Sequence, residues 1–162
     1  MNLFGYSGIA SLDAAIAGAS VTHIDASKKA INLAFENRNR NNLETLPIRY
    51  LVEDAVSFVK KEIKKEKKYD GIILDPPKYG RGPNGEIWKI EENLLDLMLL
   101  IKEILSEKPL FLVITSYAIR SSHMSLYNLL KSSLNFGYGK YSSGELGIRE
   151  SGKKRRVLSL SL

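Results

Sequence analysis

The sequence of 162 residues contains no cysteine, one tryptophan, two histidines and only five prolines. The absence of cysteine excludes disulfide bonds, thiolate metal sites and a cysteine nucleophile. No apolar run reaches the roughly 18 residues that span a bilayer, and the N-terminus lacks the charged-then-apolar order of a signal peptide. We therefore expect a soluble, cytoplasmic protein that does not cross a membrane.

The chain carries a modest excess of positive charge. Its 24 Lys and Arg residues exceed its 18 Asp and Glu residues, which gives a formal net charge of +6. Such an excess favours a polyanionic partner, although many basic proteins bind none. The length fits one compact domain, and the sequence has no internal repeat, low-complexity segment or linker. We therefore predict a single domain over residues 1–162.

One stretch in the middle of the chain combines a buried strand with an abrupt end. Residues 69–80 read YDGIILDPPKYG, and the apolar run Gly71–Leu74 suits a strand that is buried on both faces. Pro76 and Pro77 cannot continue a hydrogen-bonded strand, so the backbone must leave the sheet at Asp75. The carboxyl edge of an open α/β sheet is where ligands bind. Asp75 is therefore a candidate site residue, although Asp and Pro are also ordinary turn residues.

The N-terminal residues have the order of a strand, a glycine turn and a helix. Asn2–Phe4 can end a strand, Gly5–Gly8 is a turn of small residues, and apolar residues then recur at helical spacing until Gly18. This order opens a nucleotide-type α/β unit. The glycines have the spacing G-x-x-G, however, and the dinucleotide fingerprint G-x-G-x-x-G is absent. A tight turn that binds no ligand is the alternative for this segment.

Acidic residues follow the next two predicted strands. Ala19–Ile24 precedes Asp25, and an acid about 20 residues after a glycine turn can accept hydrogen bonds from both hydroxyls of a ribose. Ile48–Val52 precedes Asp54, which could accept a hydrogen bond from the amino group of an adenine. Each acid could instead cap the helix that follows, and Ser27 is a further good N-cap. For Asp54, one carboxylate can serve both purposes.

The alternation of strands and helices continues after the central stretch. Arg81–Trp88 is rich in Gly, Pro and Asn and predicts an irregular loop. Its tryptophan is either a core anchor, which we favour, or part of a base-stacking wall. Periodicity then predicts a well-buried helix, a buried strand and a further helix over Leu94–Leu105, Leu110–Thr115 and Ser121–Leu134.

The C-terminal residues have no helical period. Residues 144–149 and 157–162 form two extended pieces around a basic turn, Arg149–Arg156, which predicts an antiparallel hairpin on the sheet edge. The basic turn and the loop around Lys78 and Arg81 are candidate contacts for RNA phosphates. A solvated turn is an equally good interpretation of the 149–156 segment.

The whole pattern has acids at three consecutive strand ends and resembles a class I S-adenosylmethionine-dependent methyltransferase. The segments NLFGYSGIASLDAAIAGASVTHIDASKKAI, ILDPPKYGRG and GELGIRESG resemble the bacterial ribosomal-RNA large-subunit methyltransferase family, whose members typically read N-x-F-x-Y-[ST]-G, then V-D-x-S, then D-P-P. The likeness covers nearly the whole chain. It implies an α/β, Rossmann-like class I methyltransferase fold, with a mostly parallel sheet and a C-terminal antiparallel hairpin, truncated at both ends relative to the family.

The resemblance also implies an activity, a cofactor and a site. The chain is expected to transfer methyl groups from S-adenosyl-L-methionine, with ribosomal RNA as its substrate. Phe4–Gly8 would hold the methionine part of the cofactor, Asp25 the ribose and Asp54 the adenine, and the D-P-P motif would form the methyl-transfer side. The expected cofactor-binding residues are Phe4, Gly5, Tyr6, Ser7, Gly8, Asp25, Ala26, Ser27, Asp54, Ala55 and Asp75, and the expected catalytic residues are Asp75, Pro76, Pro77 and Tyr79. No metal site is expected.

The sequence departs from the family in two respects. Relatives that methylate carbon 5 of cytosine use a cysteine after the fifth strand, where this chain has residues 115–117, Thr-Ser-Tyr. A serine alcohol without an activating base is a weak nucleophile, and neither His23 nor His123 is placed by the sequence to be that base. We therefore expect direct transfer without a covalent enzyme intermediate, to an exocyclic amine that donates to Asp75 while Tyr79 stacks on the base. Relatives also carry an N-terminal RNA-binding region, so we interpret the chain as a trimmed catalytic domain.

Two other functions fit parts of the pattern. A non-catalytic remnant or nucleic-acid-binding module could keep the fold without turnover, and weak or absent cofactor binding would indicate it. A nicotinamide-dependent oxidoreductase is disfavoured by the missing G-x-G-x-x-G. The acids at the strand ends also favour a sulfonium, which is positive, over a cofactor with two phosphates.

Overall fold

The computed structural model describes residues 1–117, 121–134, 139–145, 147–149 and 157–159. The chain divides into two compact units, Met1–Ser116 and Tyr117–Leu162, and each is described by itself. The single domain over residues 1–162 therefore stays a prediction.

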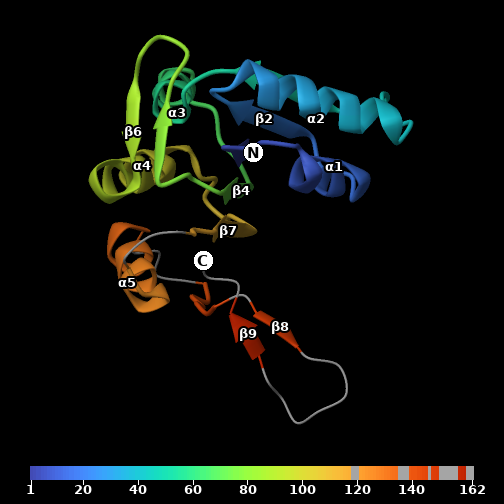
Figure 1. Cartoon of the computed structure of the whole chain (residues 1–162). Helices are drawn as coiled ribbons and strands as arrows, with labels where there is room; N and C mark the ends of the chain where they lie inside the picture. The colour runs from blue at the N-terminus through green and yellow to red at the C-terminus, as the bar shows by residue number, and fades with distance from the viewer. Residues whose placement is uncertain (118–120, 135–138, 146, 150–156, 160–162) are drawn as a thin grey trace. The chain divides into compact units, whose positions relative to one another are not determined.

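The first unit is built on a five-stranded parallel sheet in the order β3-β2-β1-β4-β7 (Figure 1). The chain enters at the middle of the sheet, proceeds to one edge and then to the other, so the strand order reverses between β1 and β4. Ligands bind at such a switch point in open α/β sheets. The predicted parallel α/β sheet is confirmed, with strands β1 (Asn2–Leu3), β2 (Val21–Asp25), β3 (Ile48–Val52), β4 (Gly71–Leu74) and β7 (Phe111–Ile114).

Four helices in this unit cover the two faces of the sheet. α1 (Ile9–Ile16) and α2 (Lys28–Arg40) lie on one side, and α3 (Ala55–Lys64) and α4 (Ile90–Ile104) lie on the other (Figure 1). Their apolar faces enclose the sheet, and this burial is the main favourable term in folding. The largest fully buried side chains include Leu3, Ile24, Phe58, Ile72, Leu74, Leu97, Met98 and Ile101.

The helix ends follow the polar and glycine residues that the sequence places there. Ser27 Oγ accepts a hydrogen bond from the Ala30 amide at 3.3 Å at the start of α2. Asp54 Oδ1 does the same for the Ser57 amide at 2.8 Å at the start of α3. These bonds satisfy amides that have no partner within the helix. Both residues are therefore N-caps.

Residues 81–88 are not the irregular loop that their composition predicted. β5 (Tyr79–Arg81) pairs antiparallel with β6 (Ile87–Lys89), and Gly80 lies opposite Trp88. The turn closes through a 2.8 Å hydrogen bond from the Gly82 amide to the Glu86 carbonyl. Gly, Pro and Asn marked the turn correctly, but the aromatic and β-branched residues beside it extend the pairing on both sides.

The helix α1 buries only part of the face that its apolar spacing predicted, since Leu12 and Ala15 are buried as expected. Ile9 and Ile16 are 62% and 60% exposed, while the polar residue Ser11 is fully buried. The Ser11 hydroxyl is hydrogen-bonded to Asn2 and to His23 on the neighbouring strands. A polar contact with the sheet therefore fixes the rotation of this helix.

The described part of the second unit contains one helix, α5 (His123–Leu134), and the strands β8 (Gly147–Arg149) and β9 (Val157–Ser159). β8 and β9 pair antiparallel, which confirms the C-terminal hairpin; its place on the edge of the main sheet stays a prediction. The basic turn that follows Arg149 lies outside the described residues. Within the parts of the chain that the structure describes, no helix has the length and apolarity needed to cross a membrane.

Candidate functional site

The strand ends bring most of the predicted site residues to one edge of the sheet. In the parallel register, Leu3 pairs with both Ile24 and Leu74, and Leu74 pairs with Ile114. The residues that follow these positions therefore lie at about the same level: Phe4, Asp75 and Thr115 just beyond their strands, and Asp25 as the last residue of β2. Asp54 joins this row from β3.

The turn Phe4–Gly8, which we call the glycine turn, has an unusual backbone. Phe4 and Tyr6 have φ angles of 57° and 44°, and Gly8 has 81°. A non-glycine residue in this left-handed region costs about 1–2 kcal/mol. The turn is anchored by a 3.0 Å hydrogen bond from the Gly5 amide to the Ile24 carbonyl. Strained backbone held in place by surrounding structure clusters at ligand sites.

Asp25 joins the glycine turn to the start of α2. Its Oδ2 accepts a hydrogen bond from the Tyr6 amide at 3.0 Å, and its Oδ1 accepts one from the Ser27 amide at 2.8 Å. A carboxylate has about four lone-pair positions, so each oxygen can accept one more donor. The two oxygens of the half-buried Asp25 can therefore receive a pair of neighbouring hydroxyls.

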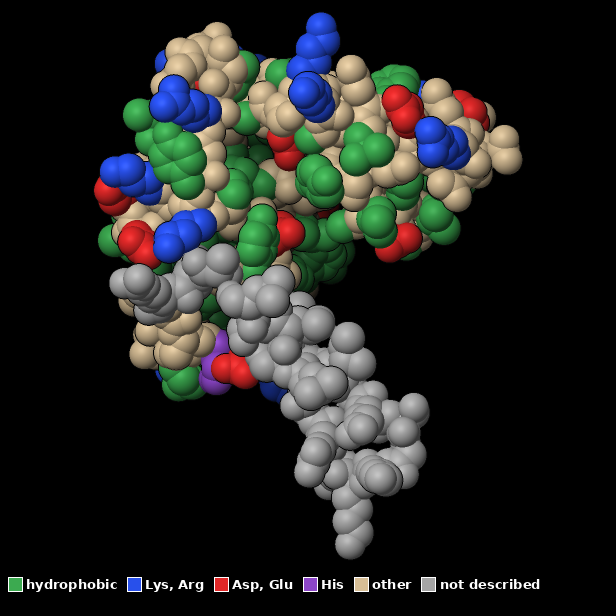
Figure 2. All heavy atoms as spheres, viewed as in Figure 1, with side chains coloured by type: hydrophobic (Ala, Val, Ile, Leu, Met, Phe, Trp, Pro, Cys, Tyr) green, Lys and Arg blue, Asp and Glu red, His purple; other side chains and the backbone are tan. Residues whose placement is uncertain are grey.

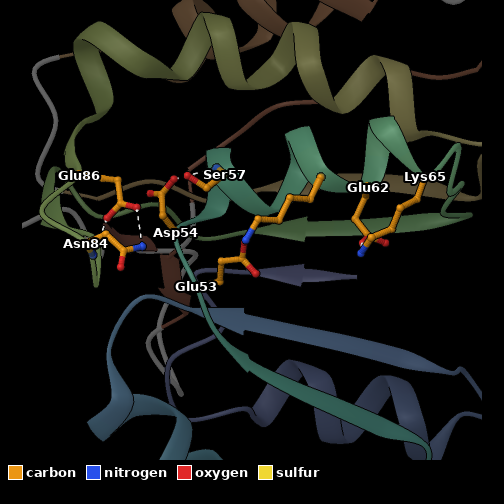
Figure 3. A network of polar contacts seen from close by, with 8 residues as sticks. Glu53, Asp54, Ser57, Glu62, Lys65, Asn84 and Glu86 are labelled. Carbon is orange, nitrogen blue, oxygen red and sulfur yellow. Dashed lines mark hydrogen bonds and ion pairs between the residues drawn. The ribbon is translucent and has the colours of Figure 1, made fainter.

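Asp54 is a buried helix cap. It is 8% exposed, and Figure 3 shows its carboxylate bonded to Ser57 in the first turn of α3. The preceding Glu53 forms an ion pair with Lys61 at 2.6 Å on the same helix. The capping interpretation of Asp54 is thus confirmed. Its contact with an adenine stays a prediction. The second carboxylate oxygen, which does not take part in the cap, is the atom that would accept that hydrogen bond.

Asp75 and Thr115 form a pair across the ends of β4 and β7. The Thr115 hydroxyl donates to Asp75 Oδ1 at 2.5 Å, and the Thr115 amide donates to the Leu74 carbonyl at 2.9 Å. Asp75 is exposed, whereas Pro76 behind it is fully buried. The buried proline fixes the backbone and the threonine holds one carboxylate oxygen, so the other oxygen has a defined orientation.

Trp88 connects the glycine turn to the D-P-P segment. Its indole Nε1 donates to the Pro77 carbonyl at 2.7 Å, and its ring lies 4.9 Å from the ring of Phe4. The tryptophan is 4% exposed, so it is the core anchor that we favoured and not an open stacking wall. A ring that contacts both segments couples their positions.

Tyr79 is the first residue of β5 and follows Asp75 by four residues in the chain. It is 50% exposed, and its hydroxyl accepts a hydrogen bond from Arg81 Nε at 3.1 Å within β5. Tyr6 of the glycine turn is 66% exposed. Figure 2 shows that hydrophobic side chains also reach the surface among acidic and basic ones on the drawn face of the first unit. Exposed aromatic rings of this kind can stack on bases.

The remaining predicted site residues have local structural roles. The Ser7 carbonyl accepts a 2.8 Å hydrogen bond from Asn37 Nδ2 of α2, which ties the glycine turn to that helix. Ala26 lies between Asp25 and Ser27, and Ala55 is the buried first residue of α3. Direct cofactor contacts of all three therefore stay predictions.

The acidic side chains at this edge of the sheet suit S-adenosylmethionine. A ribose needs two adjacent acceptors, which Asp25 offers while its other lone pairs hold the glycine turn and α2. The sulfonium is a cation, and Asp25, Asp54 and Asp75 give this edge negative charge. The residues that are present therefore fit the cofactor that the sequence implied.

Sequence reasoning missed Thr115 as a partner of Asp75 and missed the polar cluster of Asn2, Ser11 and His23. The first could have been found, because both residues directly follow parallel strands of the same sheet. The sequence carries no signal for the polar cluster. Whether a histidine in a strand is buried or exposed to solvent depends on the helix that packs over it, and the sequence does not show that packing.

Comparison with known proteins gives matches over the same part of the chain. The family described as conserved hypothetical protein 95 matches residues 1–116. A ribosomal RNA large subunit methyltransferase K/L of Shewanella frigidimarina is 35% identical over 100 residues, which are 60% of this chain and 14% of that protein. The chain spans only 14–20% of the length of the first three curated relatives that it matches.

Solved structures share the fold. The crystal structure of a SAM-dependent methyltransferase from Agrobacterium tumefaciens is 49% identical, with a TM-score of 0.93 over 98% of this chain and 52% of that one. A protein described as "a putative methyltransferase complexed with SAH" is 28% identical, with a TM-score of 0.69 over 90% of this chain and 37% of that one. The fold is therefore that of the SAM-dependent methyltransferases.

Proposed function

This chain belongs to the family described as conserved hypothetical protein 95, and we propose that it is an S-adenosylmethionine-dependent methyltransferase that acts on ribosomal RNA. The single observation that supports this most is the Asp25 carboxylate, which ties the glycine turn to α2 and still has room for two donors. Two solved structures that share the fold are described as methyltransferases, and the curated relative from Shewanella as one for ribosomal RNA.

The residues at the strand ends would divide the binding of the cofactor between them. Asp25 would accept the ribose hydroxyls, Asp54 would accept the adenine amino group through its free oxygen, and the glycine turn would lie along the methionine part. Charge-assisted hydrogen bonds of the Asp25 type are each worth about 1.5–3 kcal/mol. When bound, S-adenosylmethionine supplies an electrophilic methyl group on a sulfonium.

The D-P-P segment would hold the acceptor base. We propose an exocyclic amine as acceptor, with one N–H donated to the Asp75 carboxylate and one to the Pro76 carbonyl. These acceptors are preorganised, because Thr115 holds the carboxylate and the buried Pro76 fixes the backbone. Alignment of the reacting atoms is then the chief contribution of the protein.

RNA is the partner that the exposed surface favours. Tyr79, four residues after Asp75 in the chain, offers a half-exposed ring, and base–aromatic stacking is worth about 1–3 kcal/mol. The net charge of +6 favours a polyanion. The hydroxyl of Ser116 is assigned no role, since transfer is direct and no covalent adduct forms.

The test is single-turnover methylation of ribosomal RNA with labelled cofactor. Asp75→Asn keeps the size of the side chain and should lower the rate by about 10²-fold or more. Ser116→Ala, next to Thr115 in the chain, is the matched control and should have little effect. Loss of activity in Ser116→Ala with retention in Asp75→Asn, or a trapped covalent RNA adduct, would contradict the proposal. Cofactor binding without transfer to any RNA would favour a non-catalytic module.

A further inference from the structure

We infer that His23 is a positioning residue that sets how far the glycine turn lies from strand β2. Through the position of the turn, His23 also sets the affinity for the cofactor, and this effect on affinity rests on the proposed function. His23 lies in the middle of β2 and is fully buried. It is neither exposed to the site nor part of any motif from which a role could be assigned.

The glycine turn lies directly on the imidazole ring. A Cβ atom built on Gly5 would lie 2.3 Å from Cε1 and 2.5 Å from Nδ1 of His23, closer than non-bonded atoms approach. The φ angle of Gly5 is outside the left-handed region, so its backbone would accept any residue. The ring alone therefore excludes a side chain at position 5.

The orientation of the ring is fixed by a buried chain of hydrogen bonds. Asn2 Nδ2 donates to Ser11 Oγ at 2.9 Å, and Ser11 Oγ lies 2.8 Å from His23 Nδ1. A hydroxyl has a single proton to donate. The arrangement that uses the single proton of Ser11 is therefore donation from Asn2 to Ser11 and from Ser11 to Nδ1, which leaves the imidazole proton on Nε2.

The far side of the ring is closed by an aromatic contact. The ring of Tyr50 on β3 lies 5.1 Å from the ring of His23, at an interplanar angle of 55°. His23 Nε2 is buried and has no hydrogen-bond partner. A buried polar atom without a partner is costly, so an imidazole is a poor choice merely to fill this space. Its flat ring, hydrogen-bonded to Ser11 of α1 and in contact with Tyr50 of β3, instead gives the glycine turn a rigid support.

This support acts on the cofactor residues through two short links. Gly5 donates its amide to the Ile24 carbonyl, one residue after His23, and Tyr6 donates its amide to Asp25 Oδ2, two residues after it. The ring thus sets the distance between the turn and the strand end, on which the Tyr6–Asp25 bond depends. Asp25 in turn is the proposed ribose ligand.

The test changes the sizes of the side chains at positions 5 and 23 in opposite directions. Its readout is amide hydrogen exchange in the absence of cofactor. Gly5→Ala adds the Cβ that meets the ring, His23→Val shrinks the ring position, and the double variant combines them. Gly5→Ala should speed exchange of the Tyr6 amide by about tenfold or more, and the double variant should return it to within about threefold of the parent. A double variant that exchanges as fast as Gly5→Ala would overturn the inference.

A matched control lies at the opposite edge of the same sheet. A Cβ on Gly71 would lie 2.5 Å from the ring of Phe111, so Gly71→Ala introduces a clash with an aromatic ring away from the glycine turn, although this ring is 44% exposed and the His23 ring is buried. It should lower the midpoint of urea unfolding but leave exchange of the Tyr6 amide unchanged at low denaturant. If Gly71→Ala and Gly5→Ala speed hydrogen exchange of the Tyr6 amide equally, His23 contributes only to the general stability of the fold and the inference is wrong. Should His23→Val fail to fold, this comparison of the two alanine variants decides alone.

Calorimetry with S-adenosylhomocysteine separates the inference from the proposed function. Affinity should fall in Gly5→Ala and recover in the double variant. If the parent does not bind S-adenosylhomocysteine, the proposed function fails, while the exchange result still decides whether His23 supports the turn. If exchange recovers and affinity does not, the link from His23 to the cofactor is wrong. Nuclear magnetic resonance of the ring should find its proton on Nε2, and a proton on Nδ1 would contradict the hydrogen-bond chain.

Discussion

The Thr115 hydroxyl donates a hydrogen bond to Asp75 Oδ1 at 2.5 Å, across the ends of the paired strands β7 and β4. By the family resemblance, residues 115–117 stand where relatives that methylate carbon 5 of cytosine have a nucleophilic cysteine. Here the first of these residues orients a carboxylate. A hydroxyl that is engaged in this way stabilises the orientation of a charged acceptor, which suits direct transfer to an amine.

Thr115→Val, which keeps the shape of the side chain, should therefore lower turnover by about tenfold, the equivalent of one hydrogen bond to a charged group. Cofactor affinity should stay within about twofold, because Asp25 and the glycine turn are unaffected. Single-turnover rates and calorimetry measure the two effects, with Ser116→Ala as the neighbouring-hydroxyl control. Equal turnover in Thr115→Val and the parent would mean that the bond has no role in transfer.

Trp88→Phe should separate the two contacts of the indole. The phenyl ring can still pack against Phe4, but the bond from Nε1 to the Pro77 carbonyl is lost. We expect unfolding to become easier by about 1–2 kcal/mol, and turnover to fall more than cofactor affinity because the D-P-P segment loses its anchor. Urea unfolding followed by circular dichroism gives the first quantity. Unchanged stability and turnover would show that the buried indole bond contributes nothing.

Asp54→Ser should separate capping from cofactor binding. Serine is as good an N-cap as aspartate, so the free energy of unfolding should change by less than about 0.5 kcal/mol. Loss of the second carboxylate oxygen should weaken binding of S-adenosylhomocysteine by about tenfold. Full affinity in a stable Asp54→Ser variant would restrict Asp54 to its cap.

The pH dependence of stability should carry the signature of His23. Burial lowers the pKa of His23 to about 4, with Asp25 acting weakly in the opposite direction. The unfolded histidine, with a pKa near 6.5, therefore takes up a proton first, and stability is full above pH 6.5 and falls towards pH 4. Between pH 6.5 and 4.5 the parent should lose about 2 kcal/mol more than His23→Asn, as measured by urea unfolding at each pH. Parallel curves for the two proteins would contradict a neutral, buried imidazole.

Much of the fold was predictable because local signals and global topology agree. The apolar run at 71–74 ends at two prolines, and Ser27 and Asp54 cap helices where the sequence places them. The positions of the acids followed from the rule that parallel strands end at one edge. The predicted strand ends therefore indicated which acidic residues gather at one edge of the sheet.

The remainder depended on contacts between segments that are distant in sequence. The apolar periodicity of α1 predicted the burial of Leu12 and Ala15, but it gave no sign that Ser11 is buried against His23 while Ile9 and Ile16 are exposed. The β5–β6 hairpin was not predicted, because the Gly, Pro and Asn residues of its turn indicated an irregular loop. The missing side chain of Gly5 makes room for an imidazole ring, a contact that depends on how the turn packs on β2.

The central claim is that S-adenosylmethionine binds along the carboxyl ends of β1 to β4, with Asp25 as the ribose ligand. Calorimetric titration of S-adenosylhomocysteine into the parent and into Asp25→Ala tests it most directly. The parent should bind, and the variant should bind about tenfold to hundredfold more weakly while it remains folded. Equal affinity in the two proteins, or no binding to a folded parent, would contradict the claim.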